Sequence, residues 1–157
     1  WLSGYKVQVI GGEQDRVEEL RASVPDEGAD FEFSGRLPQS SVMKHLANQC
    51  IAVLPNRDVP DSAFTSPIKL FEYLASGCAI VASDLPSIRE LVGNEDVQWA
   101  SPGNPESLAN AIIAIASDIP RAAAMGARFY ELSARYTWQE RGRRVKSVLS
   151  NVTGNFR

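Results

Sequence analysis

The chain has 157 residues, of which 44% are hydrophobic and 22% charged, and its formal net charge is −3. This length predicts one domain, residues 1–157, with a core that needs no disulfide or metal staple. The charge balance excludes the basic surface typical of nucleic-acid-binding proteins, and no apolar stretch is long enough for a membrane span. The first residue is Trp1 rather than Met, so we expect a processed chain or a part of a longer one.

Short apolar runs alternate with helical patterns along the chain. The predicted strands are residues 5–10, 31–33, 51–54, 78–82 and 97–100. The predicted helices are residues 15–23, 40–48, 66–76, 83–92, 106–116, 120–135 and 138–152. Because short apolar strands separated by helices pair in parallel with both sheet faces covered, we predict a doubly wound, Rossmann-like α/β fold with a mostly parallel sheet of about five strands.

Cysteine, histidine and tryptophan usage gives three further expectations. Cys50 and Cys78 are too few for a disulfide framework, and each begins an apolar run, so we expect two small buried thiols and a reduced, cytoplasmic setting. The single His45 belongs to no cluster with metal-ligand spacing, so no metal site is predicted. Trp138 is predicted to anchor the core, whereas the basic run on the last helix (Arg141, Arg143, Arg144 and Lys146) is expected to face solvent.

Ligands of open parallel sheets bind beyond the carboxyl ends of the strands. This rule selects Gly11 and Gly12, the segment 35–37, the long loop 56–66 with the helix that follows, and the segment 83–90. In the last of these, Asp84, Arg89 and Glu90 are candidates to line the cleft, and a helix N-cap is at least as good an interpretation of Asp84.

The helix predicted after the long loop carries the most informative pattern. Ser66 suits the N-cap and Pro67 the first helical position. The free N–H groups of a helix start attract phosphate, Lys69 adds a full positive charge, and a Glu72 carboxylate can accept two hydrogen bonds from a ribose diol. The alternative is a surface ion pair between Lys69 and Glu72, three residues apart, which spacing alone favours.

The segment 66–83 resembles the donor-site helix and the following strand of GT-B glycosyltransferases. Its residues read Ser-Pro-Ile-Lys-Leu-Phe-Glu-Tyr-Leu-Ala-Ser-Gly up to Gly77, and Ala-Ile-Val-Ala-Ser from Ala79. The resemblance is to the large retaining group that uses nucleotide-sugar donors (family 4-like, glycosyl transferases group 1). It extends over most of the chain, through residues 9–12, 33–37, 51–55, 106–116 and 136–138.

The resemblance implies a carboxyl-terminal, donor-binding lobe of a retaining enzyme that needs neither metal nor cofactor. The donor would be a UDP- or GDP-sugar, and the acceptor-binding N-terminal lobe would be absent from this chain, which alone would be inactive. Membrane contact, at the inner face, would come only through the full-length protein. The resemblance also implies a role for each candidate residue. Lys69 would stabilise the diphosphate leaving group, and Glu72 would hold the ribose. The distal phosphate and sugar would face Ser66, Pro67 and Ile68, the base would be flanked by Gly35, Arg36 and Leu37, and the donor would lie near Gly11 and Gly12.

Two positions depart from the family pattern. Phe64 stands eight residues before Glu72, where the family has an acid, and Asp61 is the nearest alternative acid in that loop. Pro67 stands where many members have Gly, which removes one N–H donor. Two alternatives stay open. One is a GT-B-like nucleotide-sugar epimerase, and the other, which Phe64 supports, is a non-catalytic binding or scaffold module that keeps the fold with a degenerate donor site.

Overall fold

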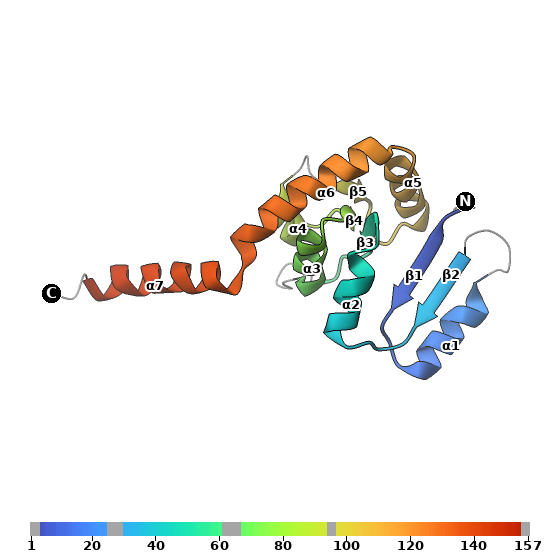
Figure 1. Ribbon diagram of the computed structural model, residues 1–157, viewed down its shortest axis with the longest axis horizontal. Helices are drawn as coiled ribbons and strands as arrows, with labels where there is room; N and C mark the ends of the chain where they lie inside the picture. The colour runs from blue at the N-terminus through green and yellow to red at the C-terminus, as the bar shows by residue number, and fades with distance from the viewer. Residues whose placement is uncertain (1–3, 25–29, 61–66, 94–96, 155–157) are drawn as a thin grey trace. The chain divides into compact units, whose positions relative to one another are not determined.

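The computed structural model describes residues 4–24, 30–60, 67–93 and 97–154 (Figure 1). The chain packs as two compact units, Trp1–Gln49 and Cys50–Arg157, and each is described by itself.

The first unit alternates strands and helices. It contains β1 (Lys6–Ile10), α1 (Gln14–Ser23), β2 (Asp30–Ser34) and α2 (Gln39–Leu46). The two strands are parallel, with Lys6 opposite Asp30 and Ile10 opposite Ser34. Among the described residues of this unit, Val17 and Leu46 are the buried hydrophobic side chains, and both strands remain partly exposed. Unit 1 therefore has a small core.

The second unit continues the alternation and ends in helices. It contains β3 (Ile51–Leu54), α3 (Ile68–Ser76), β4 (Ala79–Ser83), α4 (Pro86–Val92), β5 (Gln98–Ala100), α5 (Pro105–Ala116), α6 (Ile119–Ser133), the 3₁₀ turn η2 (Ala134–Tyr136) and α7 (Trp138–Gly154). The sheet order is β3-β4-β5, with every pair parallel, so β4 is central. All five residues of β4 are buried, as expected for a strand covered on both faces.

Helix α6 packs closely against the start of β4. Its Phe129 and Met125 are almost completely buried, and the Met125 sulfur accepts a hydrogen bond from the Ile80 N–H at 3.4 Å. A Cβ atom added to Gly126 would lie 2.1 Å from the carbonyl oxygen of Gly77, so the two backbones approach closely at a point that only glycine permits. Gly77 ends α3 in the left-handed conformation, at φ 69°.

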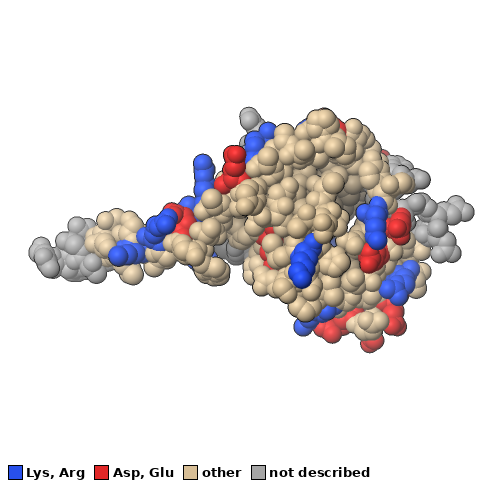
Figure 2. All heavy atoms as spheres, viewed as in Figure 1, with Lys and Arg blue, Asp and Glu red and all other residues tan. Residues whose placement is uncertain are grey.

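The last helix, α7, is exposed along the part whose side chains are described. Trp138 is 80% exposed, so the prediction that it anchors the core is wrong, and the Arg141 guanidinium lies 5.5 Å from its ring centre. The expectation of a solvent-facing basic run is confirmed, and Figure 2 shows Lys and Arg side chains along the projecting helix. The Tyr136 hydroxyl just before it donates 2.6 Å to the Leu91 carbonyl, so η2 rather than Trp138 anchors this end to the core.

The predicted α/β fold is confirmed: all five predicted strands form, in parallel pairs, and helices separate them. Their hydrogen bonds group them into one sheet of two strands and one of three. The prediction of two buried thiols holds for Cys78 but is wrong for Cys50, which precedes β3 and is exposed. Burial raises the pKa of the Cys78 thiol to about 11.

Candidate functional site

Two glycine-bearing turns lie at the carboxyl ends of β1 and β2. The Gly11 N–H donates 3.0 Å to the Ser34 carbonyl, which joins the two strand ends. Gly11 and Gly12 have φ angles of 117° and 93°, a region that other residues rarely adopt. A Cβ atom on Gly35 would lie 3.9 Å from the Gly12 carbonyl oxygen. The structure therefore brings Gly11, Gly12 and Gly35 together at one edge of this sheet.

Arg36 follows Gly35 at the same edge. Its Nη2 donates 3.0 Å to Glu13 Oε1, and both side chains are about four-fifths exposed (81% and 80%). The next residue, Leu37, is half-buried. A surface ion pair in water contributes little to stability, about 0–1 kcal/mol, so Arg36 can leave Glu13 for an anionic or polar ligand at small cost.

The first turn of α3 presents the second group of predicted residues. Pro67, rather than Ser66, precedes the helix as its N-cap, because α3 begins at Ile68. Pro67 is buried, whereas Ile68 is 70% exposed and Lys69 is exposed. The N–H groups of a helix start concentrate positive potential, and Lys69 adds a full positive charge beside them.

Glu72 lies one turn further along α3. It is half-buried, and its main-chain carbonyl accepts 2.8 Å from the Ser76 hydroxyl. The neighbouring Tyr73 has a raised pKa, chiefly through burial and then through the charge of Glu72. The Tyr73 hydroxyl lies 3.5 Å from the Val53 carbonyl oxygen, which links the middle of α3 to β3. Lys69 and Glu72 therefore project from a helix that is firmly held by the sheet.

The predicted residues thus form one group in each unit. Gly11, Gly12 and Gly35 meet in unit 1, with Arg36 and Leu37 next to them. In unit 2, Ile68, Lys69 and Glu72 share helix α3, and Pro67 is its N-cap. Ser66, Phe64 and Asp61 lie outside the described residues.

The segment after β4 contains an arrangement that the sequence suggested only in part. Leu85, not Asp84, is the N-cap of α4, so the N-cap interpretation of Asp84 is wrong. The Asp84 carboxylate instead pairs with Arg89, whose guanidinium carbon lies 4.5 Å from the centre of the Trp99 ring. Trp99 was not predicted, because only the pairing of β4 with β5 brings it to Arg89.

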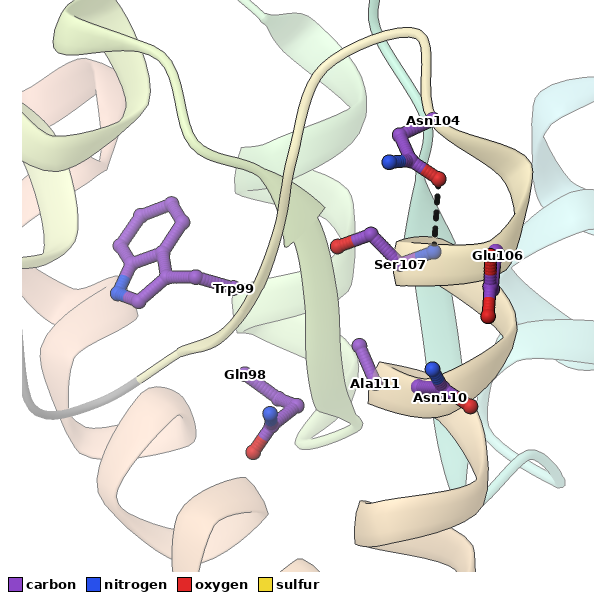
Figure 3. Close-up of a pocket in the computed structure, with 7 residues that line it drawn as sticks. All are labelled: Gln98, Trp99, Asn104, Glu106, Ser107, Asn110 and Ala111. Atoms are coloured by element: carbon purple, nitrogen blue, oxygen red, sulfur yellow. Dashed lines mark hydrogen bonds between the residues drawn. The ribbon is translucent and has the colours of Figure 1, made fainter.

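Two polar surface pockets were also not predicted. One of about 420 Å³ lies beside β5 and α5, where Asn104 accepts 3.0 Å from the Ser107 N–H (Figure 3). It is lined by Gln98, Trp99, Asn104, Glu106, Ser107, Asn110 and Ala111. The other, of about 360 Å³, belongs to unit 1 and is lined by Gln8, Ser41, Lys44, His45, Asn48 and Gln49. No motif in either stretch signalled a pocket.

Glu32 holds together a polar chain beside the second pocket. It accepts 2.8 Å from the Gln8 side chain and pairs with Lys6 at 2.9 Å, and these contacts hold the pKa of its carboxyl below the usual range. The Gln49 amide donates 2.8 Å to Gln8 in turn. These hydrogen bonds use Lys6 and Gln8, the polar residues of β1, which lie on one face of the strand.

Within the described ranges, no group of three or more His, Cys, Asp or Glu side chains is placed to hold a metal ion. In that same part of the chain, no single helix has the length and apolar content to cross a membrane, although the bent pair Pro105–Ala116 and Ile119–Tyr136 meets both criteria together.

Comparison with curated proteins finds a sugar transferase. The chain is 26% identical over 151 residues to the phosphatidyl-myo-inositol mannosyltransferase of Mycolicibacterium smegmatis. The match covers 95% of this chain but 37% of that protein, so the chain spans little more than a third of its relative's length.

Two solved structures share the fold of this chain. A sucrose-phosphate synthase from Thermosynechococcus elongatus matches with a TM-score of 0.75 and 19% identity, over 94% of this chain and 38% of that one. HepE of Anabaena, solved in complex with UDP-glucose, matches with a TM-score of 0.70 and 21% identity, over 92% of this chain and 40% of that one.

The fold is therefore that of part of a GT-B glycosyltransferase. The sequence model of the family described as glycosyl transferases group 1 matches residues 3–118, about three-quarters of the chain. This chain belongs to the glycosyl transferases group 1 family.

Proposed function

We propose that this chain is the donor-binding, carboxyl-terminal domain of a retaining glycosyltransferase that uses a UDP- or GDP-sugar without a metal ion. The observation that carries the proposal is the first half of α3, where exposed Lys69 and half-buried Glu72 stand one turn apart in a chain that belongs to this family. The binding of UDP-glucose by HepE, which has the same fold, supports a nucleotide-sugar donor.

In this proposal the residues of α3 act on the ribose and the diphosphate. Glu72 accepts hydrogen bonds from the ribose hydroxyls, and the N–H groups at the start of α3, together with Lys69, hold the diphosphate. As the bond between sugar and phosphate breaks, negative charge builds on the leaving diphosphate. A fixed positive charge that meets it there lowers the barrier to departure.

The residues of unit 1 bind the base in this proposal. Gly11 and Gly12 leave room for the donor to approach the main chain, and main-chain groups of Gly35, Arg36 and Leu37 contact the base. The acceptor and its binding residues belong to the part of the enzyme outside this chain, so we expect the isolated chain to bind a donor and to transfer no sugar.

Titration calorimetry with UDP, GDP, UDP-glucose and GDP-mannose tests the proposal. We expect wild-type binding of one nucleotide series, and a loss of about tenfold or more in Glu72→Ala, the usual effect of removing hydrogen bonds to a charged group. Glu131→Ala is the matched control, because Glu131 is an exposed glutamate on another helix of unit 2, α6.

Failure of the wild-type chain to bind any of these compounds at millimolar concentration would contradict the proposal. That outcome would favour the non-catalytic scaffold, for which Phe64 in the usual acidic position is the supporting observation. Nucleotide binding that Glu72→Ala leaves unchanged would remove Glu72 from the site.

A further inference from the structure

Asp84 stands at the carboxyl end of the central strand, between the sheet and α4. Its N–H donates 2.8 Å to the Ala100 carbonyl, which extends the pairing of β4 with β5 by one residue beyond Ser83 and Ala100. Asp84 is followed by Leu85 and Ile88, which are 2% and 1% exposed. The segment from Ser83 to Pro86, named here the β4–α4 loop, is therefore fixed by a main-chain hydrogen bond and by buried apolar anchors.

Arg89 clamps this loop from the last turn of α4. Its Nη2 donates 2.7 Å to Asp84 Oδ2, and its Nε donates to Asp84 Oδ1, so both carboxylate oxygens are engaged. Its guanidinium also lies over the Trp99 ring. The side chains of Arg89 and Asp84 are 34% and 40% exposed, so the clamp joins three consecutive elements at a place that solvent reaches.

Three properties distinguish this clamp from an ordinary surface ion pair. The guanidinium fork is bidentate, which fixes direction as well as distance. The aromatic face restricts the guanidinium from its own side. The hydrogen bond with Arg89 also holds the pKa of the Asp84 carboxyl below its usual range, because the guanidinium stabilises the charged carboxylate.

The clamp lies at the edge of the sheet where the proposed donor binds. The start of α3 is also at the carboxyl edge, and Leu70 in its first turn belongs to the same buried cluster as Leu85 and Ile88. In the proposed function, the residues of α3 hold the ribose and the diphosphate. The family resemblance assigns the sugar to Ser66, Pro67 and Ile68, and the loop after β4 is their neighbour because β3 pairs with β4.

We propose that Arg89 is a positioning residue, which acts through Asp84 to hold the β4–α4 loop in the conformation that receives the donor's sugar. This inference rests on the proposed function and assigns to the clamp the additional affinity that a nucleotide sugar has over the bare nucleotide. It predicts that loosening the clamp weakens sugar recognition and leaves recognition of the nucleoside diphosphate intact.

The test measures the dissociation constants of UDP and UDP-glucose, and of GDP and GDP-mannose, for the wild-type chain, Arg89→Lys and Arg121→Lys, with the melting temperature of each. Lysine keeps the charge but loses the fork and its stacking. Arg121→Lys is the matched control, because the Arg121 fork donates 2.8 Å to Gln98, the residue before Trp99. If Arg89→Lys does not fold, the isosteric variant Asp84→Asn is used in its place to loosen the clamp.

We expect Arg89→Lys to weaken binding of the nucleotide sugar about tenfold and to change binding of the nucleoside diphosphate less than about twofold, while Arg121→Lys changes neither. A lower melting temperature with an unchanged ratio of the two affinities would overturn the inference, because a purely structural clamp behaves in that way. An unchanged ratio with intact nucleotide binding leaves the proposed function standing, whereas absence of nucleotide binding in the wild-type chain overturns both.

Discussion

The two units of the chain bury their strands to different degrees. In unit 2 every residue of β4 is buried, and Leu70, Leu74, Ile80, Ile115 and Phe129 have no measurable exposure. In unit 1, β1 and β2 carry half-buried and exposed residues, and Val17 and Leu46 are the described side chains that are buried. Unit 2 therefore contains most of the apolar core that the described residues form.

The two units also offer different kinds of candidate binding groups. Unit 1 offers main chain, at Gly11, Gly12 and Gly35, with an exposed Arg36 beside it. Unit 2 offers side chains, Lys69 and Glu72, on a helix whose Leu70 and Leu74 are fully buried. Charged groups that act on a leaving group need a rigid support, and the well-packed unit provides one.

The largest expected effect on stability lies where α6 meets the end of α3. Gly126→Ala would place a Cβ atom 2.1 Å from the Gly77 carbonyl oxygen, so helix α6 must move. We expect the free energy of unfolding to fall by about 3 kcal/mol or more, measured by urea denaturation. The control is Gly142→Ala on α7, where a Cβ atom meets nothing within 4 Å, and where we expect a gain of about 0.5–1 kcal/mol. Equal effects of the two substitutions would refute the close approach.

A pair of isoleucines compares the cores of the two units directly. Ile80→Ala in β4 removes a fully buried side chain, and we expect a loss of about 2–5 kcal/mol. Ile10→Ala in β1 removes a half-buried one, and we expect a loss of about 1–2 kcal/mol because less apolar area returns to water. Denaturation followed by circular dichroism measures both. A larger loss in Ile10→Ala would reverse the comparison.

The smallest expected effect concerns pH. The hydrogen bond from Arg89 lowers the pKa of Asp84, so the pair stabilises the fold above the ordinary aspartate pKa, and this contribution is lost as the pH falls below about 4. Asp84→Asn should therefore melt below the wild type at pH 7, and the difference should shrink toward pH 3. Thermal melts at both values measure it, and a difference that stays constant with pH would show that the charge of Asp84 contributes nothing.

Local signals in the sequence located the strands and helices, and the strand-end rule selected the glycines of the candidate site. The apolar run closed by Pro55 predicted β3 with its observed bounds, and the left-handed position at Gly77 ended α3 where expected. Gly11, Gly12 and Gly35 were selected by the rule that ligands bind at carboxyl strand ends, and the structure places them together.

The wrong predictions concern which side chains are buried by other parts of the fold. Nothing in the pattern around Trp138 shows whether another element packs on it, and here the hydroxyl of Tyr136 makes the anchoring contact. Cys50 is exposed and lies just before β3, which begins at Ile51. The pairing of Asp84 with Arg89 over Trp99 depends on the register of β4 and β5, which a single sequence does not specify.

A nuclear magnetic resonance titration of the ¹⁵N-labelled chain with UDP-glucose and GDP-mannose examines the proposed donor site residue by residue. We expect one donor to shift the amide signals of Gly11, Gly12 and Gly35 in unit 1, and of Ile68, Lys69 and Glu72 in unit 2, along a single binding curve. The signal of Gly142 in α7 should stay in place. Shifts confined to one unit, or no shift with either donor at millimolar concentration, would rule out the proposed donor site.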